Sequence, residues 1–222
     1  EGILLRAVER DDRNADLNER YAAFLFEVGR SGEAIARARN ASTLDPLSLT
    51  KRYTVIGSLL HMSDADGARD LIEREARQFP TDPDLWALRF RHAQWDGAAN
   101  EAVALIDAPE SQIRSVRARQ CWRDAIAAAD SAPQSPARDA SLPRIVECSR
   151  SGDLPAGQSL VLFSRLGALD EAFALAQTHF VDEQRGGEDV LFSEAARPMR
   201  VDPRFMALTR EIGLLGYWRL SD

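Results

Sequence analysis

The amino-acid sequence predicts an all-α fold of stacked helical hairpins, and three observations predict it. First, the chain repeats with a period of 34 residues, since Ala34, Ala68 and Ala102 lie in similar sequence contexts. Periods of this length are typical of arrays of supersecondary units. Second, apolar residues within each period recur at the three- and four-residue spacing of amphipathic helices. Third, glycines and prolines separate these stretches where the period requires turns.

The first full repeat is expected over residues 15–46. Its first helix places apolar side chains on one face, and a turn at Gly29 and Gly32 leads to its second helix. Small residues such as Ala34 let the two helices approach closely. Pro46 ends the repeat, because its ring removes a backbone donor and disfavours helix at the preceding residue.

The same pattern predicts two further full repeats, over residues 49–80 and 83–109, with the turn of the third at Asp96-Gly97. Shifting the period backwards assigns residues 1–12 to the second half of an earlier repeat. We therefore expect the chain to be part of a longer parent protein whose preceding helix lies upstream.

Residues 110–222 are expected to form a divergent helical region that caps the array. A segment near 131–143 contains three prolines among polar residues, and this composition predicts a linker. Residues 156–165 and 169–181 have the pattern of one more hairpin, with its turn at Gly167.

The repeat resembles the tetratricopeptide repeat, a 34-residue helix-turn-helix unit. The resemblance rests on the small residues at the helix crossing, on closing prolines such as Pro46 and on the leading Trp86, and it covers about residues 1–109. It implies a right-handed superhelix of hairpins. The sequence departs from the family pattern at Gly57 and Phe90, and the third repeat lacks its closing proline.

The C-terminal end is similar to the tails of bacterial transcriptional regulators that join a winged-helix DNA-binding domain to tetratricopeptide repeats. Related tails also close repeat regions attached to nucleotide cyclases. This similarity implies a module of a larger regulatory protein, in the bacterial cytoplasm, or in the periplasm if a membrane span lies upstream. It rests on Asp202-Pro203-Arg204-Phe205, on the helix from Leu208 to Gly213 and on Tyr217-Trp218-Arg219.

Composition and motifs exclude several function classes. The net charge of -7 argues against direct nucleic-acid binding, which needs clustered Lys and Arg. No apolar run reaches the roughly 18–20 residues of a membrane span. His61, His92 and His179 are scattered without a zinc-protease pattern, and Ser159 lacks the second glycine of a nucleophile elbow. We therefore expect a non-catalytic protein without cofactor or metal.

A partner-binding groove is the predicted functional site. In stacked hairpins the first helix of each repeat lines a concave face, where side chains not used in packing can bind a peptide, a partner protein or a second copy. Tyr53, Arg91 and Trp95 are residue types enriched in binding hot spots. The alternative for Trp95 is packing against the next hairpin. The predicted groove residues are Glu19, Phe26, Glu27, Tyr53, Leu60, His61, Arg91, Gln94 and Trp95.

Two alternative functions stay open at this point. One is a small-ligand-sensing domain, with a pocket between the repeats and the second half near Trp122, Phe163 and Trp218. The other is an accessory repeat domain of a nucleotide cyclase or another enzyme.

Cys121 and Cys148 are a candidate disulfide. They are too few for a disulfide scaffold and too far apart for a zinc motif. Cys121 lies beside Trp122 in an apolar helical stretch, where a buried free thiol is the alternative. In an exported protein, a bond between the two cysteines would stabilise the fold by roughly 3–4 kcal/mol.

Overall fold

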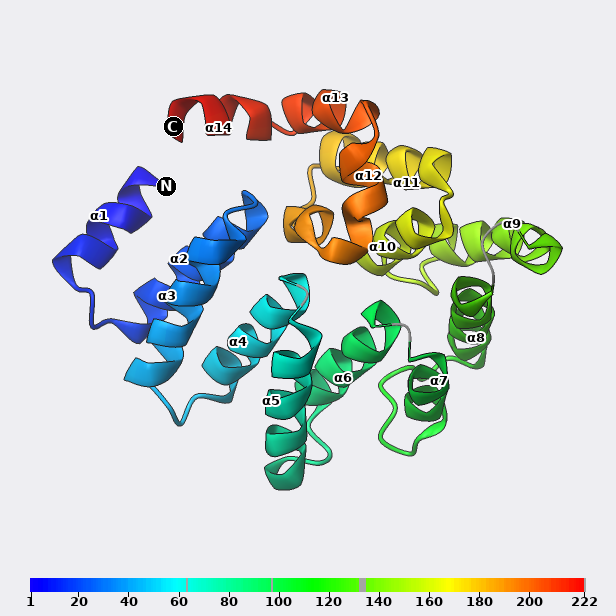
Figure 1. Cartoon of the computed structure of the whole chain (residues 1–222), viewed down its shortest axis with the longest axis horizontal. Helices are drawn as coiled ribbons and strands as arrows, with labels where there is room; N and C mark the ends of the chain where they lie inside the picture. Colours follow the sequence, from blue (N-terminus) through cyan, green and yellow to red (C-terminus); the bar gives the residue numbers. More distant parts are fainter. Residues whose placement is uncertain (63, 97, 132–134, 222) are drawn as a thin grey trace. The chain divides into compact units, whose positions relative to one another are not determined.

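The computed structural model describes residues 1–62, 64–96, 98–131 and 135–221. These residues form helices and no strand, which confirms the all-α class (Figure 1). The chain divides into two compact units, which we describe separately. The N-terminal unit comprises Glu1–Asp96 with Phe192–Glu194, and the C-terminal unit comprises Gly97–Leu191 with Ala195–Asp222. The division therefore falls inside the predicted third repeat, before the expected boundary at residue 109.

The helices before residue 96 begin at the predicted period. The first helices of successive hairpins start at residues 15, 49 and 83, and the second helices of the first two start at residues 31 and 65. Consecutive helices lie side by side in chain order (Figure 1). They are α1 (Gly2–Arg10), α2 (Ala15–Glu27), α3 (Ser31–Leu44), α4 (Leu49–His61), α5 (Ala65–Gln78) and α6 (Pro83–Trp95).

Capping residues explain why α2, α4 and α6 begin at equivalent positions. Asn14, Ser48 and Asp82 are the N-cap residues, and each side-chain oxygen accepts a hydrogen bond from the backbone N–H three residues later. The donor–acceptor distances are 3.1, 3.4 and 2.9 Å. Such caps satisfy a backbone donor that the helix itself leaves unpaired. Pro83 follows as the first residue of α6, where its missing N–H costs nothing.

The period also determines the core of the N-terminal unit. Ala22 and Ile56 are equivalent residues of α2 and α4, and both are fully buried. Ala34 and Ala68 are equivalent residues of α3 and α5, and both are also fully buried. The absence of a side chain beyond Cβ lets α3 pack closely on α2, and α5 on α4, as the sequence predicts.

A buried lysine links the first two hairpins. Lys51 is the chain's single lysine, and its side chain is only 7% exposed. Its Nζ lies 2.7 Å from Oδ1 of Asp16, 3.6 Å from Oε2 of Glu19 and 3.5 Å from Oδ2 of Asp45. The lysine therefore bridges carboxylates from α2 and from the segment before α4.

The helical elements after residue 98 are less regular. The pairs α8–α9 and α10–α11 lie side by side as hairpins. The elements are α7 (Ala99–Asp107), α8 (Val116–Asp130), α9 (Pro136–Arg150), α10 (Ala156–Leu166), α11 (Leu169–Ala176), the π-helix η1 (Gln177–Asp182), the 3-10 helices η2 (Glu188–Phe192) and η3 (Glu194–Ala196), α12 (Arg197–Val201), α13 (Arg204–Glu211) and α14 (Leu214–Ser221).

The linker expected near residues 131–143 is wrong from Pro136 onward, where α9 begins. Ser135 caps this helix by accepting a hydrogen bond from the backbone N–H of Arg138 at 3.3 Å. Pro136 occupies the first helical position, where proline is favoured, and Pro143 lies inside the helix. Pro136 therefore starts a helix that continues through Pro143. Residues 132–134 of the expected linker lie outside the described residues.

The Asp202-Pro203-Arg204-Phe205 motif joins two helices of the C-terminal unit. Arg204 donates to the Asp202 carboxylate and forms a 2.6 Å ion pair with Asp170 of α11. Its guanidinium also lies 4.5 Å from the ring centroid of Phe173. Phe205 is buried. The motif is thus a structural contact between the start of α13 and α11.

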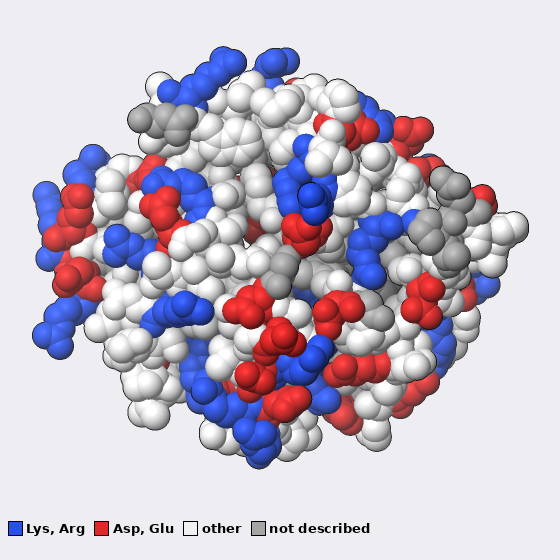
Figure 2. Space-filling view, viewed as in Figure 1, with Lys and Arg blue, Asp and Glu red and all other residues white. Residues whose placement is uncertain are grey.

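Charges of both signs are interspersed on the face shown in Figure 2, and neither sign covers a large continuous area of that face. Within the described ranges, no helix is both long and apolar enough to cross a membrane.

Candidate functional site

Three predicted groove residues form an aromatic row at the C-terminal ends of α2, α4 and α6. The ring centroid of His61 lies 5.7 Å from that of Phe26 and 5.2 Å from that of Trp95. His61 is oriented by its Nδ1, which lies 2.9 Å from the carbonyl oxygen of Gly57. The guanidinium of Arg91 lies 5.5 Å from the Trp95 ring centroid, as in a cation–π contact. The period therefore brings together residues that are 34 or 35 positions apart.

The exposure of these residues differs along the row. Phe26 and His61 are buried, at 9% and 7% exposure, whereas Trp95 and Arg91 are half-buried. Trp95 also packs against the core around α4, so it contacts the preceding hairpin. Its indole Nε1–H is buried and has no acceptor in the part of the chain that the structure describes.

Tyr53 and Leu60 belong to the hydrophobic core. Burial, reinforced by the Asp82 carboxylate, raises the pKa of the Tyr53 hydroxyl to about 12. Both residues were predicted to line the groove, because the repeat pattern reflects packing within one hairpin. It did not include the packing of α4 on α6, which covers this side of α4.

The other predicted groove residues are polar. Glu19 is half-buried, and it accepts a 3.2 Å hydrogen bond from Thr54 and pairs with Lys51. Glu27 is exposed, and Gln94 is half-buried and donates to the carbonyl of Phe90 at 3.2 Å.

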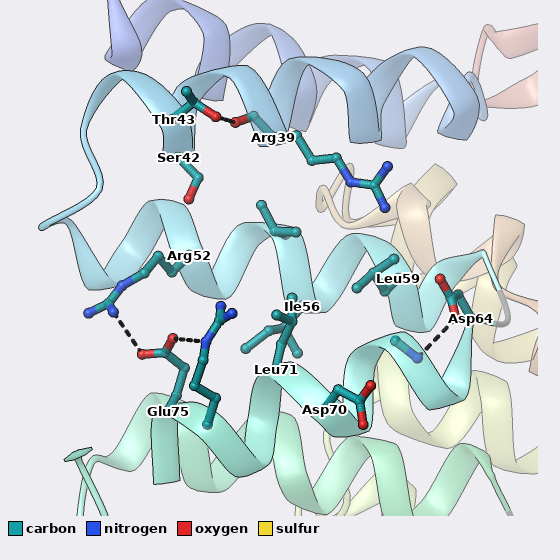
Figure 3. A pocket seen from close by; sticks show the side chains of 13 residues that line it. Arg39, Ser42, Thr43, Arg52, Ile56, Leu59, Asp64, Asp70, Leu71 and Glu75 are labelled. Carbon is teal, nitrogen blue, oxygen red and sulfur yellow. Dashed lines mark hydrogen bonds and ion pairs between the residues drawn. The ribbon is translucent and has the colours of Figure 1, made fainter. Parts of the chain in front are cut away.

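A groove that the sequence did not predict lies between α3 and α5, with α4 as its floor (Figure 3). Its volume is about 640 Å³. Glu75 lines it and is only 1% exposed, with carboxylate oxygens 3.0 Å from Arg52 and 3.5 Å from Arg74. The guanidinium of Arg52 also lies 5.6 Å from the Phe79 ring centroid. Glu75 thus lies between two guanidinium groups, and its buried carboxylate is paired with both.

One sequence signal marks this ion pair. Glu75 follows Ala68 by seven residues and Ile72 by three, so it lies on the buried face of an otherwise amphipathic helix. A charged residue at such a position requires a buried partner.

A second pocket lies within the C-terminal unit, bounded by α9, α10, α11 and η1, with a volume of about 830 Å³. Phe163 lines it, but the ligand-sensing alternative expected a pocket between the repeats and the second half, whereas this pocket lies within the C-terminal unit. Trp122 is buried in α8 and Trp218 lies on α14, and neither lines this pocket.

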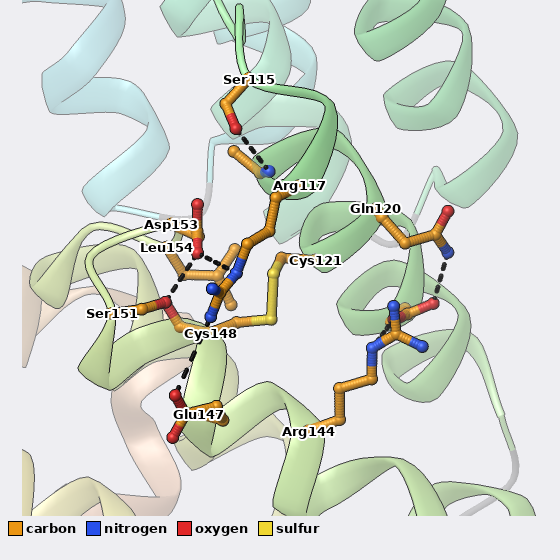
Figure 4. Close-up of a disulfide and its surroundings, with 12 residues drawn as sticks. Ser115, Arg117, Gln120, Cys121, Arg144, Glu147, Cys148, Ser151, Asp153 and Leu154 are labelled. Atoms are coloured by element: carbon orange, nitrogen blue, oxygen red, sulfur yellow. Dashed lines mark hydrogen bonds and ion pairs between the residues drawn. A yellow bond between two sulfur atoms is a disulfide. The ribbon is translucent and has the colours of Figure 1, made fainter.

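Cys121 and Cys148 form a disulfide that joins α8 to α9, with their Cα atoms 5.9 Å apart (Figure 4). Both residues are buried. Beside the bond, Nε of Arg117 lies 2.7 Å from the Asp153 carboxylate, which links α8 to the turn after α9. This region is a structural link between the two helices.

The described ranges contain no group of three or more His, Cys, Asp or Glu side chains arranged to hold a metal ion. His92 is buried, with its Nε2 3.0 Å from the carbonyl oxygen of Ala65, and His179 lies against Phe180. Both histidine side chains therefore make contacts with other residues of the fold.

No model of a known protein family matches the chain, and no curated protein matches it significantly.

Proposed function

We propose that this chain is a non-catalytic, tetratricopeptide-like interaction module of a bacterial regulatory protein, and that it binds an extended peptide on the face formed by α2, α4 and α6. The recurrence of helix starts every 34 residues supports the repeat assignment. The similarity of the C-terminal tail to those of bacterial regulators supports the regulatory role.

The contact between Arg91 and Trp95 is the observation that carries this proposal. Both residue types are enriched in binding hot spots. Both side chains are half-buried, so part of each remains accessible to a ligand. The ligand would place an apolar side chain on Trp95 and an acidic one beside Arg91.

A phage-displayed random peptide library, selected on the immobilised chain, supplies the probe. The selected peptide should bind Trp95→Ala about 30-fold more weakly, the loss typical of a hot-spot residue. Arg91→Glu should weaken it similarly by repelling the acidic side chain. Arg89→Glu is the matched control, because Arg89 lies on the same helix and has no ion pair or hydrogen bond among the described residues. Unchanged affinity for both groove variants would refute the proposal.

Sensing of a small ligand is the second candidate function. The α9–α10–α11 pocket is the observation that favours it.

A further inference from the structure

The α9–α10–α11 pocket has the size of a small-molecule site. Its volume of about 830 Å³ falls within the roughly 300–1,000 Å³ of known ligand pockets. All its lining residues belong to the C-terminal unit. A ligand here would thus bind at a site other than the proposed peptide face on α2, α4 and α6.

Apolar side chains line part of the pocket. Phe163 and Leu154 line it but are nearly fully buried, whereas Leu175 of α11 is half-buried and provides accessible apolar surface. Ligand sites are mostly lined in this way, with a few polar groups that fix the orientation of the ligand. The apolar lining favours a ligand with a hydrocarbon side chain.

Three charged side chains of the pocket wall, Asp170, Glu183 and Arg185, are paired within the protein. Asp170 pairs with Arg204 at 2.6 Å, and Glu183 pairs with Arg185 at 2.7 Å. These groups are already paired within the protein, so they do not need a charged group from a ligand.

Arg150 and Glu171 differ from these pairs. Each lines the pocket, Arg150 exposed to solvent and Glu171 half-buried, and neither has an ion pair or hydrogen bond within the described residues. An arginine binds a carboxylate through two parallel hydrogen bonds, and a glutamate binds an ammonium group. A ligand with both charges would satisfy both side chains, whereas a singly charged ligand would satisfy one.

The wall of the pocket also includes an irregular backbone segment. His179 lines the pocket from η1, a π-helix. Segments of this type are rare and occur frequently at functional sites. The segment ends near Gln184, a non-glycine residue with a φ of 50°. The irregular backbone and the unpaired charges thus occur at the same pocket.

We infer that this pocket binds a short zwitterionic peptide of two or three apolar residues. Arg150 binds the terminal carboxylate, Glu171 binds the terminal ammonium, and the apolar surface around Leu175 receives the side chains. A single amino acid would leave most of the space empty. The inference concerns a different site from the proposed peptide face and a ligand bound by its two termini.

Isothermal titration of the full chain with trileucine tests this inference. Trileucine should bind saturably, and Arg150→Ala and Glu171→Gln should each weaken binding at least about tenfold, since each removes a charged hydrogen-bond partner. Arg210→Ala is the matched control, because Arg210 is exposed on α13 and does not line the pocket. Arg91→Glu should leave trileucine affinity unchanged, which separates this site from the proposed peptide face.

Modified ligands assign each charge to its partner. C-terminally amidated trileucine should bind the unmodified protein at least about tenfold more weakly but lose nothing further in Arg150→Ala. N-acetylated trileucine should show the same relation to Glu171→Gln. Circular dichroism should show unchanged folding in all variants.

Three results would overturn the inference. They are the absence of saturable trileucine binding, equal affinity for Arg150→Ala and the unmodified protein, and equal affinity for the blocked and free peptides.

Discussion

At the scale of single residues, Lys51 is a buried cation whose partners come from three separate positions. Hydrogen bonding to Lys51 lowers the pKa of Asp16, and hydrogen bonding to Asp16 raises the pKa of Lys51. The charged forms of both groups therefore stabilise the folded state. Asp45 and Glu19 complete the set of carboxylates around the ammonium.

The first prediction concerns Lys51→Met, which should lower the melting temperature at pH 7 by several degrees. The contribution of the Asp16 charge to folding stability is complete above the ordinary Asp pKa of 3.8, and it is lost as the pH falls through the lowered pKa of Asp16. The contribution of the Lys51 charge to folding stability is complete below the ordinary Lys pKa of 10.5, and it is lost as the pH rises through the raised pKa of Lys51. The stability difference between Lys51→Met and the unmodified protein should thus be constant from about pH 5 to pH 9 and shrink on either side.

Urea denaturation at a series of pH values measures this difference, and exposed Arg77→Ala on α5 serves as the control. A constant difference down to strongly acidic pH would contradict the assigned ion pair.

The second prediction concerns the buried Glu75. Glu75→Gln removes the carboxylate between Arg52 and Arg74, so it should reduce the free energy of unfolding by about 1–3 kcal/mol. Exposed Glu73→Gln on the same helix should change it by less than about 0.5 kcal/mol. Equal values for the two variants in chemical denaturation would show that the ion pair contributes nothing.

Residue identity alone predicted buried positions better than exposed ones. Ala34 and Ala68 were recognisable because small residues recur at one column of the period. Tyr53 was assigned to the groove because its burial depends on α6, and contacts between hairpins follow from packing that the period does not encode. Arg150 and Glu171 carry no sequence signal, because only the fold brings them to one pocket.

At the scale of elements, helix starts were predictable where capping and periodicity agree. Asn14, Ser48 and Asp82 cap equivalent helices, and the apolar pattern begins directly after each. The pattern was misleading around Pro136, because the same proline that breaks a helix interior also favours its first position.

The third prediction concerns the α8–α9 link. The double variant Cys121→Ser, Cys148→Ser should lower the free energy of unfolding of the C-terminal unit by roughly 3 kcal/mol, because the bond closes a loop of 27 residues. Denaturation with and without reductant measures the effect, and reductant should not affect the variant.

Mass spectrometry after alkylation in denaturant without reductant provides the direct check. The unmodified protein should incorporate no alkyl group. Two alkylated thiols in protein isolated under non-reducing conditions would contradict the disulfide.

At the scale of the whole molecule, the chain combines a periodic N-terminal unit with a less regular C-terminal unit. The proposed peptide face and the α9–α10–α11 pocket lie in different units, so single substitutions can test each site separately. The mixed charges on the face shown in Figure 2 agree with recognition by a few specific residues, because a surface without a dominant sign provides little long-range electrostatic steering.

The most direct test of the proposed function is hydrogen–deuterium exchange of the full chain with and without its phage-selected peptide. We predict slower exchange at the C-terminal ends of α2, α4 and α6, around Phe26, His61 and Trp95, with α3 and α5 unchanged. Protection confined to α3 and α5, or to the C-terminal unit, would contradict the assigned peptide face.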